Sequence, residues 1–299
     1  YTTLFRSYAI MQHIKCNHSI AILLATYNSE KFLREQLVSL FSQSYKDWTL
    51  YIHDDGSKDA TLSIISEYLS SHNNIVLLDF PPTGGAKSNF MQMLSCVEAD
   101  YYMFCDHDDV WLNTKVEITY NSMNKAEKTF PNCPIIVHSD LFVVDQDLNV
   151  LHPSFWKYEG IYPNDIHSFE MLSAFNLATG CTMMINSRAK EVTPCDCKEA
   201  LMHDSWITAA VLWSKGKVID IDQPLIYYRQ HGDNCLGARQ LNVTLVSKLL
   251  RLPQIIKDNI RRYRMLNKVG HISAFRFIKY KVIGRKKLLS HIKEENLLT

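Results

Sequence analysis

The sequence predicts an α/β protein in which helices flank a mostly parallel sheet, and three observations support this. Short apolar runs, each followed by polar residues, are expected to be strands at 19–25, 48–53, 75–79 and 101–105. Segments with apolar residues at helical spacing alternate with them at 32–41, 59–69 and 88–97. Strands that alternate with helices imply right-handed crossovers between parallel neighbours. With 299 residues, of which 46% are hydrophobic and 21% charged, the chain is typical of a globular protein.

Polar clusters follow three of the expected strands. The first strand runs into residues 26–29 (TYNS), which is typical of a turn and a helix cap. The second ends at residues 54–57 (DDGS), and the fourth at residues 106–109 (DHDD). Because ligands of parallel sheets bind beyond the carboxyl ends of the strands, we expect the three clusters to meet in one crevice.

The second half of the chain is less regular. We expect strands at 135–138, 141–144, 179–185, 218–221 and 225–228. A helix is expected over residues 204–213. From residue 241 the pattern becomes helical, with breaks at Pro253 and near Gly270.

The charge distribution divides the chain further. Residues 241–299 contain 14 Lys and Arg but only 3 Asp and Glu, although the whole chain has a net charge of +1. We therefore expect an N-terminal extension (1–18), a catalytic domain (19–240) and a basic helical region (241–299). Residues 1–7 (YTTLFRS) resemble a translated adapter, so residues 1–10 are expected to be an artefact and Met11 the natural start. With no evident signal peptide or membrane span, the sequence predicts a cytoplasmic protein.

The DHDD segment has the composition of a metal site. Carboxylates crowded at the end of a strand raise one another's pKa unless a cation relieves them. Hard oxygen ligands suit Mg²⁺ or Mn²⁺, which carry phosphate oxygens well. The DDGS segment is more ambiguous, because Asp and Gly also form ordinary turns.

The order of the motifs is more specific than any one of them. Residues 25–28 (ATYN), 54–59 (DDGSKD) and 106–109 (DHDD) resemble family 2 glycosyltransferases with the GT-A fold. Residues 180–182 (GCT), 203–206 (HDSW) and 228–232 (YRQHG) extend the resemblance, which covers about residues 19–237. It is closest to the branch that builds bacterial O-antigen and capsular polysaccharides, often as rhamnosyltransferases.

The resemblance implies roles in binding a nucleotide-diphosphate sugar. Thr26 and Tyr27 lie at the donor, where Tyr27 packs on the base. Asp55 accepts the imide N–H of the base. Asp106 contacts the ribose or the metal, and Asp108 binds the Mn²⁺ or Mg²⁺ ion that bridges the two phosphates.

Four further residues have a less defined place. His231 is expected to complete the metal shell. Lys87 is a phosphate contact in one interpretation and a solvated surface lysine in the other. Arg229 is a candidate partner of the diphosphate, since a guanidinium binds phosphate in a fork. Asp109 either supports the metal ligands or holds the acceptor.

Asp204 is the candidate catalytic base. Inverting sugar transfer needs a carboxylate that removes the proton of the acceptor hydroxyl. The alternative is a carboxylate that only stabilises the N-terminus of a helix. The resulting hypothesis is an inverting, metal-dependent glycosyltransferase that acts on a growing surface glycan, free or lipid-linked. The alternatives are a sugar nucleotidyltransferase and a non-catalytic protein that binds nucleotide sugars or glycans.

The basic region has two interpretations. It is either a solvated helical face that covers the catalytic domain or a helix that lies on an anionic membrane surface. A lipid-linked acceptor would favour the second, with the protein on the inner face of the bacterial membrane. Nucleic acid is not an expected partner, because no recognisable binding motif is present.

Overall fold

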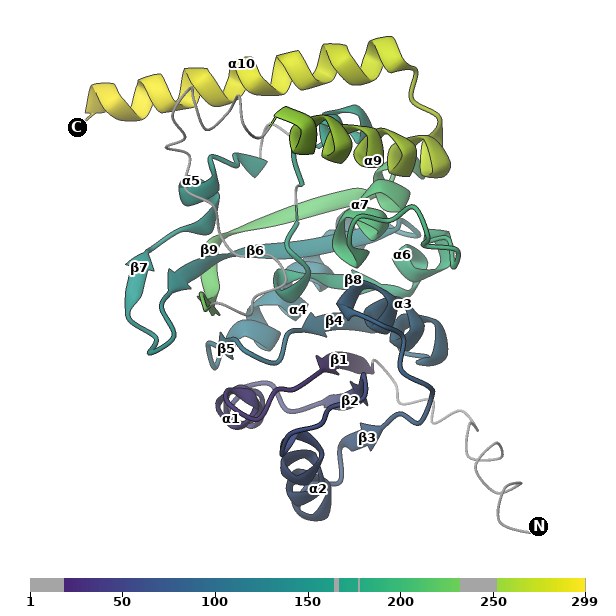
Figure 1. Cartoon of the computed structure of the whole chain (residues 1–299), viewed down its shortest axis with the longest axis vertical. Helices are drawn as coiled ribbons and strands as arrows, with labels where there is room; N and C mark the ends of the chain where they lie inside the picture. Colours follow the sequence, from purple (N-terminus) through teal and green to yellow (C-terminus); the bar gives the residue numbers. More distant parts are fainter. Residues whose placement is uncertain (1–18, 164–166, 177, 232–251, 299) are drawn as a thin grey trace.

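The computed structural model describes residues 19–163, 167–176, 178–231 and 252–298 (Figure 1). The expected N-terminal extension and residues 232–251 of the domain boundary lie outside the described residues.

One nine-stranded sheet runs through the molecule. Its strands are β1 (Ile20–Thr26), β2 (Trp48–Asp54), β3 (Ile75–Leu77), β4 (Tyr101–Cys105), β5 (Val110–Trp111), β6 (Ile135–Val144), β7 (Val150–His152), β8 (Met184–Asn186) and β9 (Lys217–Arg229). The strand order is β3-β2-β1-β4-β8-β6-β9-β5, and β7 pairs with β6. The four strands at one end, β3, β2, β1 and β4, are all parallel, as the alternation of strands and helices predicted.

The rest of the sheet is mixed, so the predicted parallel arrangement is complete only in the half that contains β1–β4. β8 is antiparallel to both β4 and β6, β5 is antiparallel to β9, and β7 is antiparallel to β6. Among the strands of the described residues, only β6 and β9 form a further parallel pair. Parallel neighbours need a crossover of a dozen or more residues, and after β4 the regular alternation with helices is lost.

The five strands expected in this half differ from the prediction in number and extent. The segment at 179–185 begins as a 3-10 helix, η3 (Gly180–Thr182), before the short β8. The two pairs of short strands merge into the long strands β6 and β9, whose register shifts at Ser139 and Asp140. Polar residues therefore interrupted the apolar pattern at a bulge without ending the strand.

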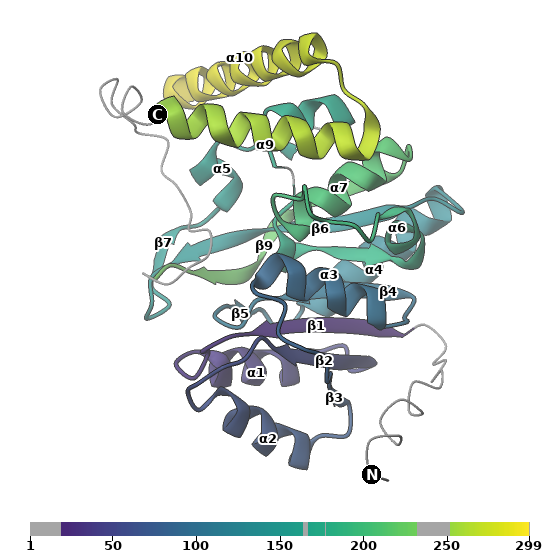
Figure 2. The same cartoon turned by 45° about the vertical axis from the view of Figure 1, so that its right-hand side comes forward.

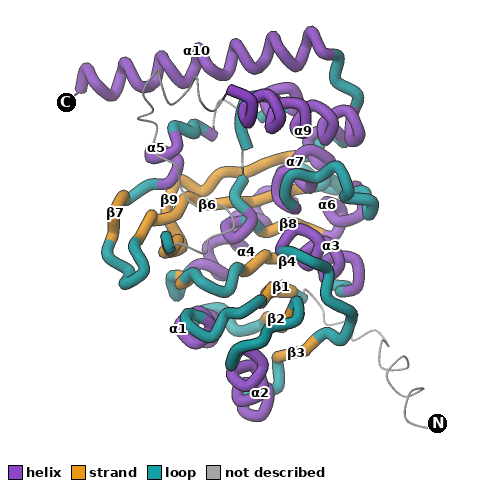
Figure 3. Tube along the Cα trace, viewed as in Figure 1, coloured by secondary structure: helices purple, strands orange, loops and turns teal. Residues whose placement is uncertain are grey.

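Helices cover both faces of the sheet (Figures 2 and 3). They are α1 (Leu33–Phe41), α2 (Thr61–Ser71), α3 (Ala86–Cys96), α4 (Lys115–Thr129), α5 (Phe155–Glu159), η2 (Phe169–Ser173), α6 (Ser187–Val192), α7 (His203–Trp213), α9 (Leu252–Gly270) and α10 (Ala274–Leu298). Alternate residues of β1 point to opposite faces. Leu23 packs in the core layer with α3 and α7, whereas Ile22 and Leu24 pack with α1, α2 and α4.

The basic C-terminal region packs on the catalytic domain. α9 lies over α7 and η2, and α10 lies against η2 (Figures 1 and 2). α9 begins at Leu252, so Pro253 lies in its first turn, where its missing N–H is not needed, and the residues before Leu252 lie outside the described part of the chain. Gly270 ends α9 against Trp213, where a Cβ would come within 2.4 Å of the indole ring. Among the described residues, no helix has the length and hydropathy required to cross a membrane.

Candidate active site

The parallel strands β1, β2 and β4 bring their polar ends to one edge of the sheet. Thr26 pairs in register with Asp54, and the backbone N–H of Asp55 donates to the Thr26 carbonyl over 2.9 Å. β4 is the other neighbour of β1, so Asp106 follows at the same edge. The convergence expected from the sequence is therefore present.

Thr26 and Tyr27 have different positions in this edge. Thr26 is buried, and its hydroxyl donates to Asp54 Oδ1 over 3.0 Å. Its side chain therefore joins the ends of β1 and β2 and is not directed outward. The side chain of Tyr27 is 56% exposed, which leaves its ring available to a planar ligand.

Asp55 organises the loop that precedes α3. Its carboxylate accepts the backbone N–H groups of Thr83, Gly84 (3.3 Å) and Gly85 (2.7 Å). Gly84 and Gly85 have φ angles of +81° and +140°, which residues with a Cβ adopt only under strain. One carboxylate thus holds a glycine loop beside the edge at which β1, β2 and β4 end, a role that the sequence did not indicate.

Lys87 does not extend into this edge. Its Nζ donates to the carbonyl of Ala200 over 3.2 Å and so joins α3 to the segment before α7. The ammonium group thus uses one of its three donors on protein backbone, and its contact with phosphate stays a prediction.

The carboxylates of the DHDD segment repel one another. Burial and the charges of Asp108 and Asp204 raise the pKa of Asp106 to about 7. Burial and the charges of Asp108 and Asp106 raise the pKa of Asp109 well above its usual value. Both pKa shifts mean that burial and like charges disfavour the ionised carboxylates. A cation bound at this edge would offset this electrostatic cost.

Two groups of side chains at this edge could hold such a cation. In the first, His231 Nε2 lies 2.8 Å from Asp108 Oδ2, with Asp106 nearby. In the second, atoms of Asp106, Asp109 and Cys181 lie within 4.8 Å of one another, the one such group found in the part of the chain described. Burial raises the pKa of the Cys181 thiol well above its usual value. The first group fits Mn²⁺ or Mg²⁺ better, because a buried, protonated thiol is a poor ligand for either ion.

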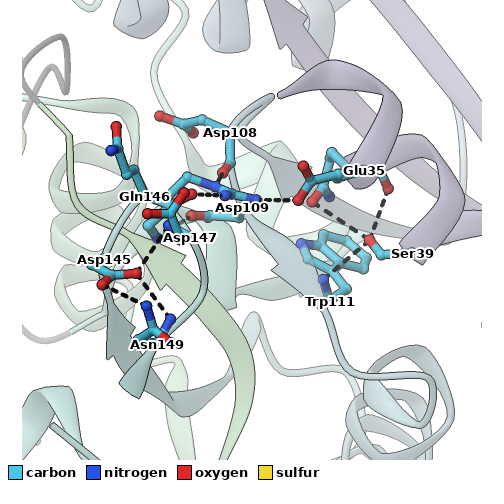
Figure 4. A network of polar contacts seen from close by, with 11 residues as sticks. Glu35, Ser39, Asp108, Asp109, Trp111, Asp145, Gln146, Asp147 and Asn149 are labelled. Atoms are coloured by element: carbon cyan, nitrogen blue, oxygen red, sulfur yellow. Dashed lines mark hydrogen bonds and ion pairs between the residues drawn. The ribbon is translucent and has the colours of Figure 1, made fainter. Parts of the chain in front are cut away.

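Arg229 has a different place from the one the sequence suggested. Its guanidinium is buried and bonds to three protein groups around the acidic segment: Glu35 (2.6 Å), the Asp108 carbonyl (2.8 Å) and the Gln146 carbonyl (Figure 4). A fork that is committed to protein groups in this way holds the DHDD segment in place. The proposed pairing of Arg229 with the diphosphate is therefore not supported.

Asp109 belongs to the same network. It is fully buried, and its Oδ1 accepts the backbone N–H of Arg229 over 3.2 Å (Figure 4). Of the two roles left open for Asp109, this geometry favours support of the metal ligands over contact with the acceptor.

Asp204 lies in the first turn of α7 and is buried. Its Oδ2 accepts Asn176 Nδ2 and the Gly180 N–H, both over 3.2 Å, and its Oδ1 accepts the Ser205 N–H. Burial raises its pKa to about 6, and these three donors oppose the shift. The carboxylate is therefore held in a fixed orientation and is ionised at neutral pH, as a general base must be.

Gly180 and His203 form a close contact beneath this carboxylate. A Cβ at Gly180 would lie 2.3 Å from His203 Nε2, so only glycine brings its N–H this close to Asp204. His203 packs against Phe90 and Phe104, and burial lowers its pKa to about 3. His203 is therefore neutral and acts in packing.

Solved structures with the same fold are known. S. aureus TarS in complex with UDP-GlcNAc aligns with a TM-score of 0.59 at 14% identity, covering 91% of this chain and 73% of TarS. The mannosyltransferase PcManGT from Pyrobaculum calidifontis, in complex with GDP-Man and Mn²⁺, aligns with a TM-score of 0.58 at 13% identity, covering 90% and 69%. The fold is that of GT-A glycosyltransferases.

Sequence comparison identifies the family. The model of glycosyl transferase family 2 matches residues 21–191, more than half of the chain. The protein belongs to this family and is a glycosyltransferase. The nucleotidyltransferase alternative does not agree with this membership.

Curated relatives have diverse names. The dTDP-rhamnosyl transferase RfbG of Shigella flexneri is 27% identical over 77% of this chain and 78% of its own length. An uncharacterised glycosyltransferase of Rickettsia typhi, RT0329, is 28% identical over 56% of this chain, and the match spans half of that relative. The Escherichia coli protein WfgD, named UDP-Glc:alpha-D-GlcNAc-diphosphoundecaprenol beta-1,3-glucosyltransferase, is 28% identical over 38% of this chain and 44% of its own.

Proposed function

We propose that the protein is an inverting glycosyltransferase that moves a sugar, rhamnose or another hexose, from a nucleoside diphosphate to a growing cell-surface glycan. The observation that carries the proposal is the position of Asp204. A buried, oriented carboxylate lies close enough to the acidic edge for its charge to raise the pKa of Asp106. A base beside a diphosphate-binding edge is the arrangement that direct displacement at an anomeric carbon requires.

Each residue then has one task. The ring of Tyr27 packs on the base of the nucleotide, and Asp55, beside its glycine loop, accepts the imide N–H. Asp108, Asp106 and His231 would hold Mn²⁺ or Mg²⁺, which would supply positive charge beside the departing diphosphate. Asp204 removes the proton of the acceptor hydroxyl as that oxygen attacks.

The names of two relatives support the proposed donor and acceptor classes. The name of RfbG, a dTDP-rhamnosyl transferase, favours dTDP-rhamnose as the donor. The name of WfgD favours an acceptor that is carried on a lipid diphosphate. Because discrimination of a few kcal/mol can depend on one hydrogen-bonding group, we expect one donor to be preferred clearly.

A panel of nucleotide sugars tests the donor. We expect dTDP-rhamnose to raise the melting temperature more than UDP-glucose, UDP-GlcNAc or GDP-mannose, and only with Mn²⁺ or Mg²⁺ present. The measurement is a thermal shift, followed by release of the nucleoside diphosphate with a lipid-linked acceptor. Stabilisation and turnover with another donor would replace rhamnose, and no response to any donor would contradict the proposed function.

The outer surface of α10 supports a membrane location. Phe275, Ile278, Val282 and Leu289 are exposed, Phe275 by 76%, and their spacing places them on one face of the helix. Lys279, Arg285 and Lys286 are exposed in the same helix. We propose that this set, the α10 surface, lies on the anionic inner leaflet, where the acceptor lipid would be presented.

Charge removal tests the α10 surface. Replacing Lys279, Arg285 and Lys286 with Gln should weaken binding to vesicles with 30% phosphatidylglycerol by about two orders of magnitude, since each cation contributes roughly 1 kcal/mol. Truncation of the basic region is unsuitable, because it would remove the buried Met265 and Leu266 and expose the residues of α7 and η2 that pack against α9 and α10. The matched control replaces Val150 and Leu151, exposed apolar residues of β7, with Ser. Full retention of the Gln variant on these vesicles would contradict the proposal.

A further inference from the structure

The inner face of α9 contacts the segment that carries the base. Met265 is buried, and its Sδ accepts the N–H of Leu201 over 3.5 Å. The hydroxyl of Ser205 lies 3.6 Å from the same sulfur. α9 therefore touches the chain on both sides of Asp204, although it lies some 60 residues further along the chain.

Arg262 lies one turn before Met265 on this inner face. Its Nη1 donates to the carbonyls of Leu172 and Phe175, both over 3.1 Å. These carbonyls belong to η2 and the turn that follows it. The next residue is Asn176, whose Nδ2 donates to Asp204 Oδ2. A continuous chain of contacts thus runs from α9 to the carboxylate of the base.

The positive charge of Arg262 also interacts with Asp204. Burial lowers the pKa of Arg262, and Asp204 is the first carboxylate that opposes this effect. Within the described residues no carboxylate lies within 4 Å of the guanidinium, so Arg262 has no ion pair there. A half-buried cation whose guanidinium binds carbonyl groups and no carboxylate is costly to the fold, which favours a functional reason for its position.

A second cation reaches the same turn from α10. Lys281 Nζ donates to the carbonyl of Ser173 over 3.2 Å. Burial and the charge of Arg262 lower the pKa of Lys281 to about 8. Both C-terminal helices thus bind carbonyl groups at the C-terminal end of η2. Of the two cations, only Arg262 contacts Phe175, the residue before Asn176.

We propose that Arg262 is a positioning residue for catalysis: it fixes the turn at Phe175, and through Asn176 it orients the Asp204 carboxylate toward the acceptor. The inference rests on the proposed role of Asp204 as the base. It makes α9 part of the catalytic apparatus, in addition to any role that the C-terminal helices have at a membrane.

The test compares variants at Arg262 and Asn176 with the wild-type enzyme, all in the presence of Mn²⁺. Arg262→Met should lower kcat by about 10- to 100-fold, because a misplaced catalytic group loses much of its effect. The Kd of the donor should stay within about twofold. Arg262→Lys should recover part of kcat, since an ammonium can donate to the same carbonyls. Asn176→Ala should give a similar loss without altering α9, and in the double variant the losses should not multiply.

Arg276→Met is the matched control. Arg276 also binds η2, through Glu170 over 2.9 Å, but at the end of η2 that is remote from Asn176. We expect its kcat to stay within about twofold of the wild type. Three outcomes would each overturn the inference. They are equal kcat values for Arg262→Met and Arg276→Met, a loss of donor affinity in Arg262→Met as large as its loss in kcat, and losses in kcat that multiply when Arg262→Met and Asn176→Ala are combined. Absence of turnover in the wild type would instead refute the proposed function.

Discussion

Asp204→Asn should lower kcat by about 10²- to 10⁴-fold, the range that a general base contributes. The amide keeps the size of the carboxylate but cannot accept the proton of the acceptor hydroxyl. Donor affinity should stay within about twofold, because the nucleotide-binding residues lie on other elements. The measurement is kcat with the preferred donor, together with the Kd of the donor by calorimetry.

A carboxylate at the opposite edge of the sheet provides the control. Asp100, at the start of β4, accepts the N–H of Ser19 over 2.9 Å, so Asp100→Asn changes the same group away from the site. Its kcat should match that of the wild type. Turnover by Asp204→Asn within about threefold of the Asp100→Asn variant would remove Asp204 as the base.

The pH profile follows from the same group. Since burial raises the pKa of Asp204 to about 6, the carboxylate is protonated and inactive below that pH and becomes active above it. The value of kcat/KM at saturating Mn²⁺ should therefore rise through pH 6 in the wild type. The residual activity of Asp204→Asn should lack this rise.

Local sequence patterns predicted the half of the fold that contains β1, β2 and β4, whose ends form the candidate site. Buried strands such as Tyr101–Cys105 read as apolar runs, and helices such as Leu33–Phe41 show apolar spacing. The helix Lys115–Thr129 was missed although Val116, Tyr120 and Met123 have helical spacing. The mixed half could not be predicted, because antiparallel pairing between β4, β8 and β6 depends on contacts between distant segments.

Side-chain direction limits the prediction of the site. Its motif suggests that Arg229 binds phosphate. In the structure its guanidinium instead pairs with Glu35, which lies 194 residues away in the sequence. Arg262 and Asn176 were missed for the same reason, because their partners are distant in the sequence. One signal was available for Arg262: it continues the apolar stripe of Met265 and Leu266, where an arginine is unusual.

The second large effect is expected at the metal site. Asp108→Asn replaces the carboxylate beside His231 with a neutral amide and should lower kcat/KM by at least about 100-fold, because a metal supplies several kcal/mol of charge stabilisation. Mn²⁺ should no longer raise the melting temperature of this variant. In the wild type the Mn²⁺ effect should grow with pH, since a proton on Asp106, whose pKa is about 7, competes with the ion.

Two further variants decide which carboxylates hold the ion. Asp147→Asn removes the same charge from the neighbouring, exposed turn and should leave the Mn²⁺ titration unchanged. Asp109→Asn should weaken the network around Arg229 but keep the response to Mn²⁺. If Asp108→Asn keeps the response and Asp109→Asn loses it, the ion binds in the deeper group of Asp106, Asp109 and Cys181. The leaving diphosphate would then have to reach an ion beside Asp109, a side chain that is fully buried.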